Sequence, residues 1–311
     1  MDEKVKNMTG FVATIGMFDG VHRGHQFVLS RVVQCAREHG LQSMAITFDR
    51  RREAGDVLTP LDEKLLLLSK TDIDRVEVLS FTDELRCMTA HEFMQQVLKE
   101  RFGVKILMIG YDNRFGHNRE EGFDDYVRYG RELDMEVICL PPAPASIAPG
   151  LSSPTSHTLS SSLIRRLLTE GRVREAAAGL GYPYTIMGTV EHGEHIGTRL
   201  GFPTANLTPI DSQQLIPAPG VYAVKVRLEH SMEQKHGMMN IGRRPTFDGT
   251  RQTLETHIFQ LHDDLYGQRL LVSFVERLRD EQRFDSVEAL KAQLQQDKAA
   301  AEAALNSISS K

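Results

Sequence analysis

The chain has 311 residues and a formal net charge of −5, with 41% hydrophobic and 25% charged residues. This is the composition of a globular protein of about two domains, and it excludes a wholly disordered chain. The mild acidity and the lack of any apolar run of ~18–20 residues predict neither a nucleic-acid partner nor a membrane span. Cys35, Cys87 and Cys139 are too far apart for a local zinc knuckle or a redox pair. Because residues 1–10 hold no apolar signal region, we predict a cytoplasmic protein. No obligatory protein partner is predicted.

The first 140 residues alternate between short apolar runs and helical patterns. The predicted strands are residues 11–15, 44–48, 76–79, 104–109 and 136–140, and the predicted helices are residues 26–39, 62–70, 89–102 and 123–133. Gly40 is suited to end the first helix, and Thr89 with Glu92 forms a capping box. Strands that alternate with helices predict an α/β domain built on a parallel sheet.

The second half of the chain has a different texture. Residues 141–158 are rich in proline, serine and threonine and predict a linker or mobile loop, and helical patterns follow at residues 161–169 and 173–180. Short strand patterns then predict a small antiparallel barrel or sandwich, closed by a terminal helix at residues 286–304. These β-like runs are residues 184–190, 220–229, 235–241, 252–259 and 268–275. We therefore predict two domains, residues 1–180 and residues 181–311.

Residues 13–25, ATIGMFDGVHRGH, lead from the first strand into the first helix. A parallel sheet binds ligands at the carboxyl ends of its strands, and a helix N-terminus attracts phosphate. His22 and His25 can face one ligand, and Gly24 between them leaves room for a phosphate. The alternative is two surface histidines around a turn glycine. A metal site is disfavoured, because no carboxylate or third histidine stands nearby at ligand spacing.

This segment resembles the opening of the bacterial bifunctional riboflavin kinase/FAD synthetases, a branch of the HxGH nucleotidylyltransferases. Residues 110–116, GYDNRFG, and residues 159–165, LSSSLIR, resemble two further segments of that family. The resemblance implies a Rossmann-like domain that transfers the adenylyl group of ATP to FMN and releases pyrophosphate. No GxxxxGK[ST] motif is present, which excludes a P-loop mechanism.

The resemblance also implies site residues in this domain. His22, His25 and Arg165 would be catalytic and would stabilise charge on the triphosphate. From the residues alone, Arg165 on a helix could equally be solvated. The implied nucleotide-binding residues are Gly16, Phe18, Gly24, Asp112, Ser161 and Ser162.

Two departures from the family pattern bear on this domain. Met17 stands where the family usually has asparagine, and residues 47–52 read TFDRRR where the family has TFEPHP. Arg50, Arg51 and Arg52 could supply charge for the FMN phosphate or form a solvated loop. The departures support an alternative function: a riboflavin kinase with an inefficient or regulatory N-terminal nucleotide-binding domain.

Residues 201–206, GFPTAN, lie early in the β-rich half. Thr204 and Asn206 share one side of an extended segment, where a hydroxyl and an amide oxygen can ligate a hard cation such as Mg²⁺. Turn chemistry is the alternative. The segment resembles the signature of riboflavin kinases, whose fold is a six-stranded barrel. Further segments match that module in order: residues 240–247, NIGRRPTF, residues 254–258, LETHI, residues 264–267, DLYG, and residues 278–285, LRDEQRFD.

The resemblance implies that the second domain phosphorylates riboflavin with ATP. Glu255 lies in an apolar, threonine-rich strand, and its implied role is general base on the ribityl 5′-hydroxyl; a solvated face is the alternative. The other implied residues are Thr204 and Asn206 for the metal, Gly197 and Asn240 for the nucleotide, and Arg279 and Phe284 for the flavin. The predicted ligands are thus ATP, Mg²⁺, riboflavin, FMN and FAD. A different HxGH transferase and a non-enzymatic flavin-binding protein are the remaining alternatives.

Overall fold

The computed structural model describes residues 10–49, 57–110, 113–117, 120–149, 151, 159–192, 197, 200–246, 249–261 and 263–309. The chain divides into two compact units. The first comprises residues 1–52, 59–149 and 154–160, and the second comprises residues 53–58, 150–153 and 161–311.

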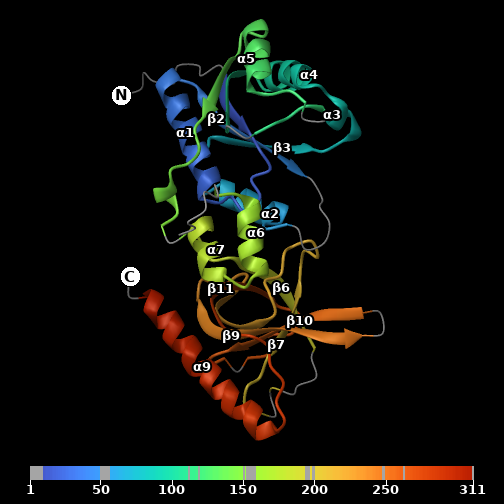
Figure 1. The fold of residues 1–311 in the computed structure, drawn as a ribbon, viewed down its shortest axis with the longest axis vertical. Coiled ribbons are helices and arrows are strands. Elements are labelled where there is room, and N and C mark those ends of the chain that lie inside the picture. The colour runs from blue at the N-terminus through green and yellow to red at the C-terminus, as the bar shows by residue number, and fades with distance from the viewer. Residues whose placement is uncertain are drawn as a thin grey trace. The chain divides into compact units, whose positions relative to one another are not determined.

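The first unit is built on a five-stranded sheet in the order β3-β2-β1-β4-β5, in which all neighbouring strands are parallel (Figure 1). Its strands are β1 (Phe11–Ile15), β2 (Gln42–Asp49), β3 (Arg75–Ser80), β4 (Val104–Gly110) and β5 (Glu136–Leu140). The strands fall where the apolar runs predicted them, and the α/β class of this unit is confirmed.

Helices pack on the sheet from both sides. They are α1 (Arg23–His39), α2 (Leu61–Leu68), α3 (Asp83–Cys87), α4 (Ala90–Glu92), the π-helix η1 (Phe93–Arg101) and α5 (Phe123–Glu132), with a short 3₁₀ turn η3 (Ala145–Ile147). Successive residues of β4 serve the two faces: Ile106 packs in the core that includes Val32 and Ala36 of α1, whereas Leu107 packs with Met94 and Tyr126. Burial on both faces explains why these strands are apolar throughout.

The capping box predicted at Thr89 is present, with the Glu92 carboxylate accepting the Thr89 backbone N–H at 2.9 Å. The helix that follows is wound differently from the prediction. It continues as the π-helix η1, in which the N–H of Phe102 bonds the carbonyl of Val97, five residues back, at 3.1 Å. Periodicity over so short a segment does not distinguish a π-helix from an α-helix.

The second unit holds a closed barrel in the order β10-β7-β6-β11-β8-β9, with antiparallel neighbours throughout. Its strands are β6 (Thr185–Glu191), β7 (Ala205–Pro209), β8 (Gly220–Leu228), β9 (Lys235–Thr246), β10 (Gly249–Ile258) and β11 (Arg269–Arg279). The sequence left a barrel and a sandwich open, and the resemblance implied the six-stranded barrel, which is confirmed. The predicted terminal helix is α9 (Val287–Ser309), which lies along the outside of the barrel (Figure 1).

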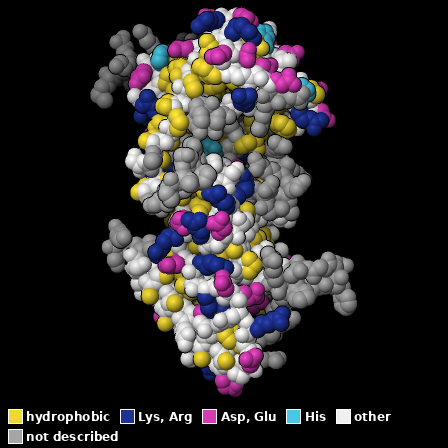
Figure 2. All heavy atoms as spheres, in the orientation of Figure 1, with side chains coloured by type: hydrophobic (Ala, Val, Ile, Leu, Met, Phe, Trp, Pro, Cys, Tyr) yellow, Lys and Arg dark blue, Asp and Glu magenta, His cyan; other side chains and the backbone are white. Residues whose placement is uncertain are grey.

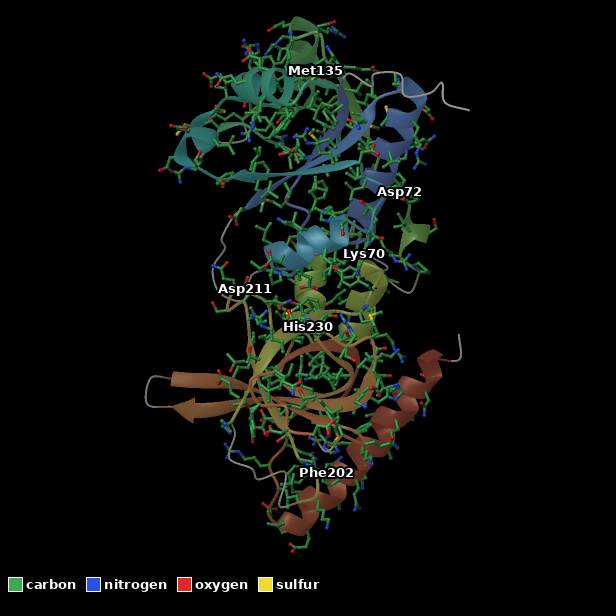
Figure 3. All side chains as sticks on the ribbon, turned by 180° about the vertical axis from the view of Figure 1, so that it is seen from behind. Lys70, Asp72, Met135, Phe202, Asp211 and His230 are labelled. Carbon is green, nitrogen blue, oxygen red and sulfur yellow. The ribbon has the colours of Figure 1, made fainter. Side chains whose placement is uncertain are left out.

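A core under α9 joins the helix to the barrel. Ala301 and Leu305 are fully buried against Ala223 of β8 and Phe202, and Figure 3 shows Phe202 within this unit. Since α9 is rich in alanine, it can approach the strands closely, and this packing keeps the helix attached.

Helices α6 (Ser161–Thr169) and α7 (Val173–Leu180) belong to the same compact unit as the barrel. Arg174 of α7 pairs with Glu276 of β11 at 2.7 Å, and the N–H of Ala218 bonds the carbonyl of Leu168 at 3.0 Å. The predicted domain boundary at residue 180 stays a prediction, but these contacts attach residues 161–180 to the barrel.

Among the described residues, no helix is both long and apolar enough to cross a bilayer. On the face drawn in Figure 2, basic and acidic side chains are interspersed across the described surface, without a continuous patch of either sign.

Candidate functional sites

The first site lies where β1 ends and α1 begins. The connecting loop has positive φ at Phe18 (48°), Gly20 (81°) and Val21 (32°), and such values are unusual for non-glycine residues. Hydrogen bonds hold this conformation: Gly20 donates to the Thr59 hydroxyl at 2.9 Å, and Thr59 donates to the Asp19 carboxylate at 3.2 Å. A strained loop fixed from a neighbouring segment is typical of functional sites.

The two histidines of this site are stacked. The ring centroids of His22 and His25 lie 3.7 Å apart with an interplanar angle of 17°, and His22 is buried. His22 also caps α1, because its Nδ1 accepts the backbone N–H of His25 at 3.3 Å. An accepting Nδ1 places the proton of a neutral His22 on Nε2. The sequence prediction that both rings could serve one ligand is compatible with this stack.

His25 is held in its neutral form. Burial of the imidazole lowers the pKa of His25 well below its ordinary value, and the neighbouring His22 and Lys64 lower it further. Its Nδ1 is enclosed and has no hydrogen-bond partner in the described structure, and the edge of the Phe18 ring packs against it at a centroid distance of 5.3 Å.

Gly16 and Gly24 each lie close to an aromatic ring of this site. A Cβ at Gly24 would lie 3.0 Å from the His22 ring, and a Cβ at Gly16 would lie 3.3 Å from the Phe18 ring. The sequence argument gave Gly24 the task of admitting a phosphate. The structure adds that Gly24 makes room for His22.

Sequence reasoning missed two residues that join the neighbouring loops. Lys64 of α2 is buried, and its ammonium donates to the carbonyls of Met17 at 3.3 Å and Phe48 at 3.0 Å. Asn113, in the loop after β4, donates its side-chain amide to the carbonyl of Ile15 at 2.6 Å. These contacts tie the carboxyl ends of β1 and β2 and the loop after β4 together, next to the point between β1 and β4 where the strand order reverses. That point is the ligand-binding position of such sheets. A lysine on a leucine-rich helix gave no signal of this role.

For the other predicted residues of this site, the predicted roles stay predictions. Ser161, Ser162 and Arg165 lie in the first two turns of α6, in the second compact unit. Arg165 is half-buried and Ser162 is exposed. Asp112 and residues 50–52 lie outside the described residues, so their predicted roles stay predictions.

The second site is a cavity of about 240 Å³ in the barrel unit. Gly197, Thr204, Asn240, Glu255, Arg279 and Phe284 all line it, which brings together six of the predicted residues. The seventh, Asn206, is paired with Glu255 across the β7–β10 ladder, and Glu255 is paired with Asn240 across the β9–β10 ladder. Side chains on neighbouring strands at one register position share a face, so Glu255 lies between two amides. It is half-buried, as the sequence argument required.

The oxygen donors of this cavity suit a hard cation. Thr204 and Asn206 offer a hydroxyl and an amide oxygen beside the carboxylate of Glu255, and Mg²⁺ selects oxygen ligands. Gly197 keeps the space next to Thr204 open: a Cβ there would collide with the carbonyl of Phe202 and approach the Thr204 hydroxyl oxygen to 3.2 Å. Within the described part of the chain, no three His, Cys, Asp or Glu side chains form a metal cluster. Any ion here would therefore depend on the neutral donors and its substrate.

One wall of the cavity is fixed by a buried ion pair that the sequence did not reveal. Asp297 of α9 is 3% exposed and accepts two bonds from the Arg279 guanidinium, at 2.9 and 2.7 Å. Gln293 donates to the same carboxylate at 2.9 Å. The guanidinium also lies over the Phe284 ring, 5.7 Å from its centroid. The two predicted flavin-binding residues are therefore in contact with each other.

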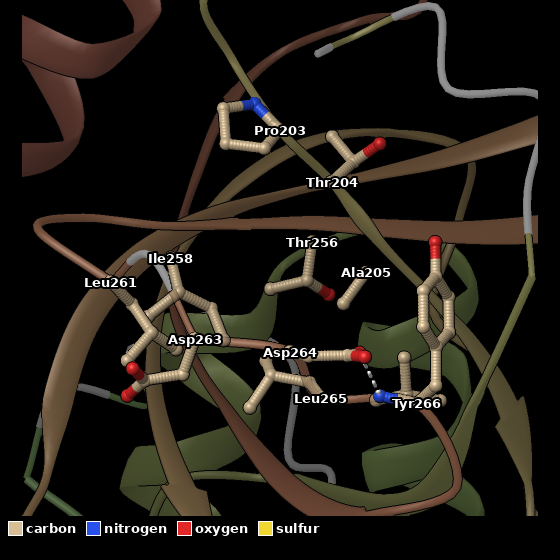
Figure 4. Close-up of a pocket in the computed structure, with 11 residues that line it drawn as sticks. Pro203, Thr204, Ala205, Thr256, Ile258, Leu261, Asp263, Asp264, Leu265 and Tyr266 are labelled. Atoms are coloured by element: carbon tan, nitrogen blue, oxygen red, sulfur yellow. Dashed lines mark hydrogen bonds between the residues drawn. The ribbon is translucent and has the colours of Figure 1, made fainter.

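A second cavity of about 270 Å³ adjoins this one and shares Thr204 as a lining residue. Figure 4 shows it between Thr204, Thr256 and the segment 263–266, where the Asp264 carboxylate accepts the N–H of Tyr266 at 3.0 Å. The hydroxyl of Thr256 is buried without a hydrogen-bond partner in the described structure. Such a group favours a polar ligand in this cavity.

Comparison with known proteins agrees with this geometry. Residues 4–149 match the family model for FAD synthetase, and residues 180–305 match the model for riboflavin kinase. The chain belongs to the bifunctional riboflavin kinase/FMN adenylyltransferase family. Relatives with that name include one from Escherichia coli (strain K12), 36% identical over 93% of this chain and 90% of its own length. Another, from Haemophilus influenzae, is 35% identical over 96% of both chains.

A solved structure described as a macrolide-efflux protein from Streptococcus pneumoniae also resembles the chain. It has a TM-score of 0.83 and 30% identity, and the match covers 96% of each chain. The likeness supports the fold, and the efflux named in that description is said of that protein alone.

Proposed function

We propose that this chain makes FAD from riboflavin in two ATP-dependent reactions. The barrel unit phosphorylates riboflavin to FMN, and the unit with the parallel sheet transfers an adenylyl group from ATP to FMN and releases pyrophosphate. The observation that supports this most strongly is the gathering of Glu255, Thr204 and Asn240 around one cavity of a chain that matches both family models.

In the kinase reaction, Glu255 takes the proton of the riboflavin 5′-hydroxyl as that oxygen attacks the γ-phosphorus of ATP, and ADP leaves with the oxygen that bridged the β- and γ-phosphorus atoms. Glu255 is paired with Asn206 and with Asn240 on the two neighbouring strands, which puts an amide on each side of the base. Arg279 and Phe284 offer a cation and a ring face to the flat flavin. ATP in the adjoining cavity would direct its phosphates toward Thr204, the residue common to both cavities. Thr204 and Asn206 would hold Mg²⁺, which neutralises phosphate charge in such reactions.

In the adenylyl transfer, a phosphate oxygen of FMN attacks the α-phosphorus of ATP. The protein supplies position and charge stabilisation rather than a covalent intermediate. His22, whose Nδ1 is already an acceptor, donates to the phosphates from Nε2, His25 donates to them as well, and Arg165 neutralises the departing pyrophosphate. The carbonyl of Met17 accepts a hydrogen bond from Lys64, a backbone contact that does not depend on the side chain at this position. This backbone contact supports retention of activity despite the departure from the family's asparagine.

We further propose a cytoplasmic location, Mg²⁺ as the cation, and a protein without nucleic-acid, membrane or obligatory protein partners.

Two substitutions test the assignment of one reaction to each site. Glu255→Gln should lower riboflavin phosphorylation on the order of 10²–10⁴-fold, because the general base is lost, and leave FMN adenylylation intact. His25→Ala should do the reverse, since it removes a donor to the phosphates. Products of each protein with ATP and Mg²⁺ are separated by chromatography, starting from riboflavin and from FMN. FMN accumulating from riboflavin in the wild type, without FAD from either mixture, would leave the kinase-only alternative.

A further inference from the structure

His257 is a buried residue of the kinase unit to which the mechanism above gives no role. Its side chain lines the cavity that holds Glu255, which stands two residues earlier on β10 and therefore faces the same side of the strand. The Nδ1 atom of His257 lies 2.8 Å from the carbonyl oxygen of Pro203. A carbonyl can only accept, so the imidazole carries the proton on Nδ1 and donates it.

The bond from His257 to Pro203 lies at the end of the β7–β10 ladder. The β7–β10 ladder pairs Thr256 with Ala205 and Glu255 with Asn206, and it extends no further toward residue 204. Continuing the register would put His257 opposite Thr204. Pro203 has no N–H to offer a neighbouring strand, so its carbonyl is the polar backbone group available for attachment. The imidazole thus holds the chain one residue before Thr204, where the ladder has stopped.

Packing fixes the imidazole itself. The Phe202 and Phe259 rings lie against it at centroid distances of 5.3 and 5.6 Å. On the other side of the loop, the carbonyl of Gly197 accepts the N–H of Phe202 at 2.9 Å. Residues 202–204 are therefore held from two sides, by Gly197 and by His257.

We propose that His257 is a positioning residue for phosphoryl transfer: through the Pro203 carbonyl it sets the hydroxyl of Thr204 against the carboxylate of Glu255. This inference rests on the proposed kinase function. His257 touches neither the phosphates nor the reacting hydroxyl in this scheme. Its effect reaches the reaction through the geometry of the oxygen donors that would hold Mg²⁺.

Substituting His257 with asparagine or glutamine distinguishes the hydrogen bond to Pro203 from simple packing of the imidazole. Asparagine can place its NH₂ near the position of the imidazole Nδ1, whereas glutamine places its NH₂ near the position of Nε2. His257→Asn should therefore keep the bond to Pro203, and His257→Gln and His257→Leu should lose it. The measurement is riboflavin phosphorylation as a function of Mg²⁺ concentration, with the KM for riboflavin and the thermal unfolding of each variant.

We expect His257→Gln and His257→Leu to need about tenfold more Mg²⁺ for half-maximal rate, with the KM for riboflavin little changed, because a misplaced ligand weakens the metal site. His257→Asn should stay within about threefold of the wild type. FMN adenylylation in the same chain is the internal control. Equal loss in the Asn and Gln variants, or an unfolded barrel in His257→Gln, would overturn the proposal. A wild type that does not phosphorylate riboflavin would instead refute the proposed function.

Discussion

At the scale of single residues, the sequence indicated the polar groups of the sites better than it indicated their supports. His22, His25, Thr204 and Glu255 stand in motifs whose spacing suggests chemistry. In the sequence, Lys64 is a single lysine outside any motif. Only the fold shows that its ammonium binds the carbonyls of Met17 and Phe48. Supports such as this one act through the backbone, which leaves no side-chain pattern to detect.

The lowered pKa of His25 has a consequence for stability. Its pKa in the folded chain lies below the ordinary value that it regains on unfolding. As pH falls through the ordinary pKa of histidine, His25 is protonated in the unfolded chain but not in the folded chain, so unfolding becomes more favourable. The first unit should therefore resist denaturant less at about pH 5.5 than at about pH 7.5.

The variant His25→Gln should reduce this difference, because glutamine does not titrate. Denaturant midpoints followed by circular dichroism at the two pH values are the measurement. His230→Gln is the matched control, since the His230 side chain is 93% exposed. A pH dependence in His25→Gln equal to that of the wild type would contradict the assignment.

At the scale of elements, periodicity and capping predicted most of the fold. The strands of the sheet and helices α6 and α7 lie where their patterns placed them. The π-helical turn of η1 and the short helix α3 were missed, because a five-residue helix and a change of helical winding leave the apolar spacing almost unchanged. The strand β7 was expected only as an extended segment, since its five residues become a strand through pairing with distant partners.

Gly24 and Gly197 each lie beside one of the two sites, so an alanine substitution at each tests one site. Gly24→Ala pushes a Cβ against the His22 ring, and Gly197→Ala pushes one into the Phe202 carbonyl. The His22 ring must give by a few tenths of an ångström, whereas the Phe202 carbonyl must move further. A shift of about 1 Å in a reacting group can cost on the order of 10²-fold in rate, so we expect the larger loss in the Gly197 variant. Gly24→Ala should thus impair adenylylation alone, and Gly197→Ala should impair phosphorylation alone.

Each glycine variant is the control for the other, because both activities are assayed in the same preparation. Gly122→Ala serves as a further control, since a Cβ at that position meets no atom within 4 Å. Loss of both activities in either site variant would indicate misfolding rather than a displaced catalytic group.

At the scale of the whole molecule, the composition and the two kinds of strand pattern were enough to predict two units of different class. The predicted boundary at residue 180 stays a prediction. Helices α6 and α7 look like a continuation of the α/β pattern, yet they belong to the barrel unit, to which the Arg174–Glu276 ion pair and the hydrogen bond from Ala218 to Leu168 join them. A helical pattern reveals an apolar face without revealing which partner will cover it.

Two reactions with separate site residues should complement each other between molecules. Glu255→Gln retains adenylylation and His25→Ala retains phosphorylation, so a mixture of the two proteins should convert riboflavin to FAD when neither does so alone. FAD should appear after a lag in which FMN accumulates, and chromatography over time measures it. A mixture that makes FMN but no FAD would show that FMN released into solution does not reach the second site.

The closure of the barrel has a consequence for how the kinase site can fail. Two residue pairs join β10 to β7, whereas ten join β10 to β9, and one of the two is the pair Glu255–Asn206. The shortest ladder around the ring thus joins two residues of the proposed kinase site that lie far apart in sequence. Local openings of a structure begin where the fewest bonds must break. Opening of the β7–β10 ladder would separate the Glu255 carboxylate from the Asn206 amide while the other strands stay paired. The kinase site could then be disrupted in a molecule that is otherwise folded.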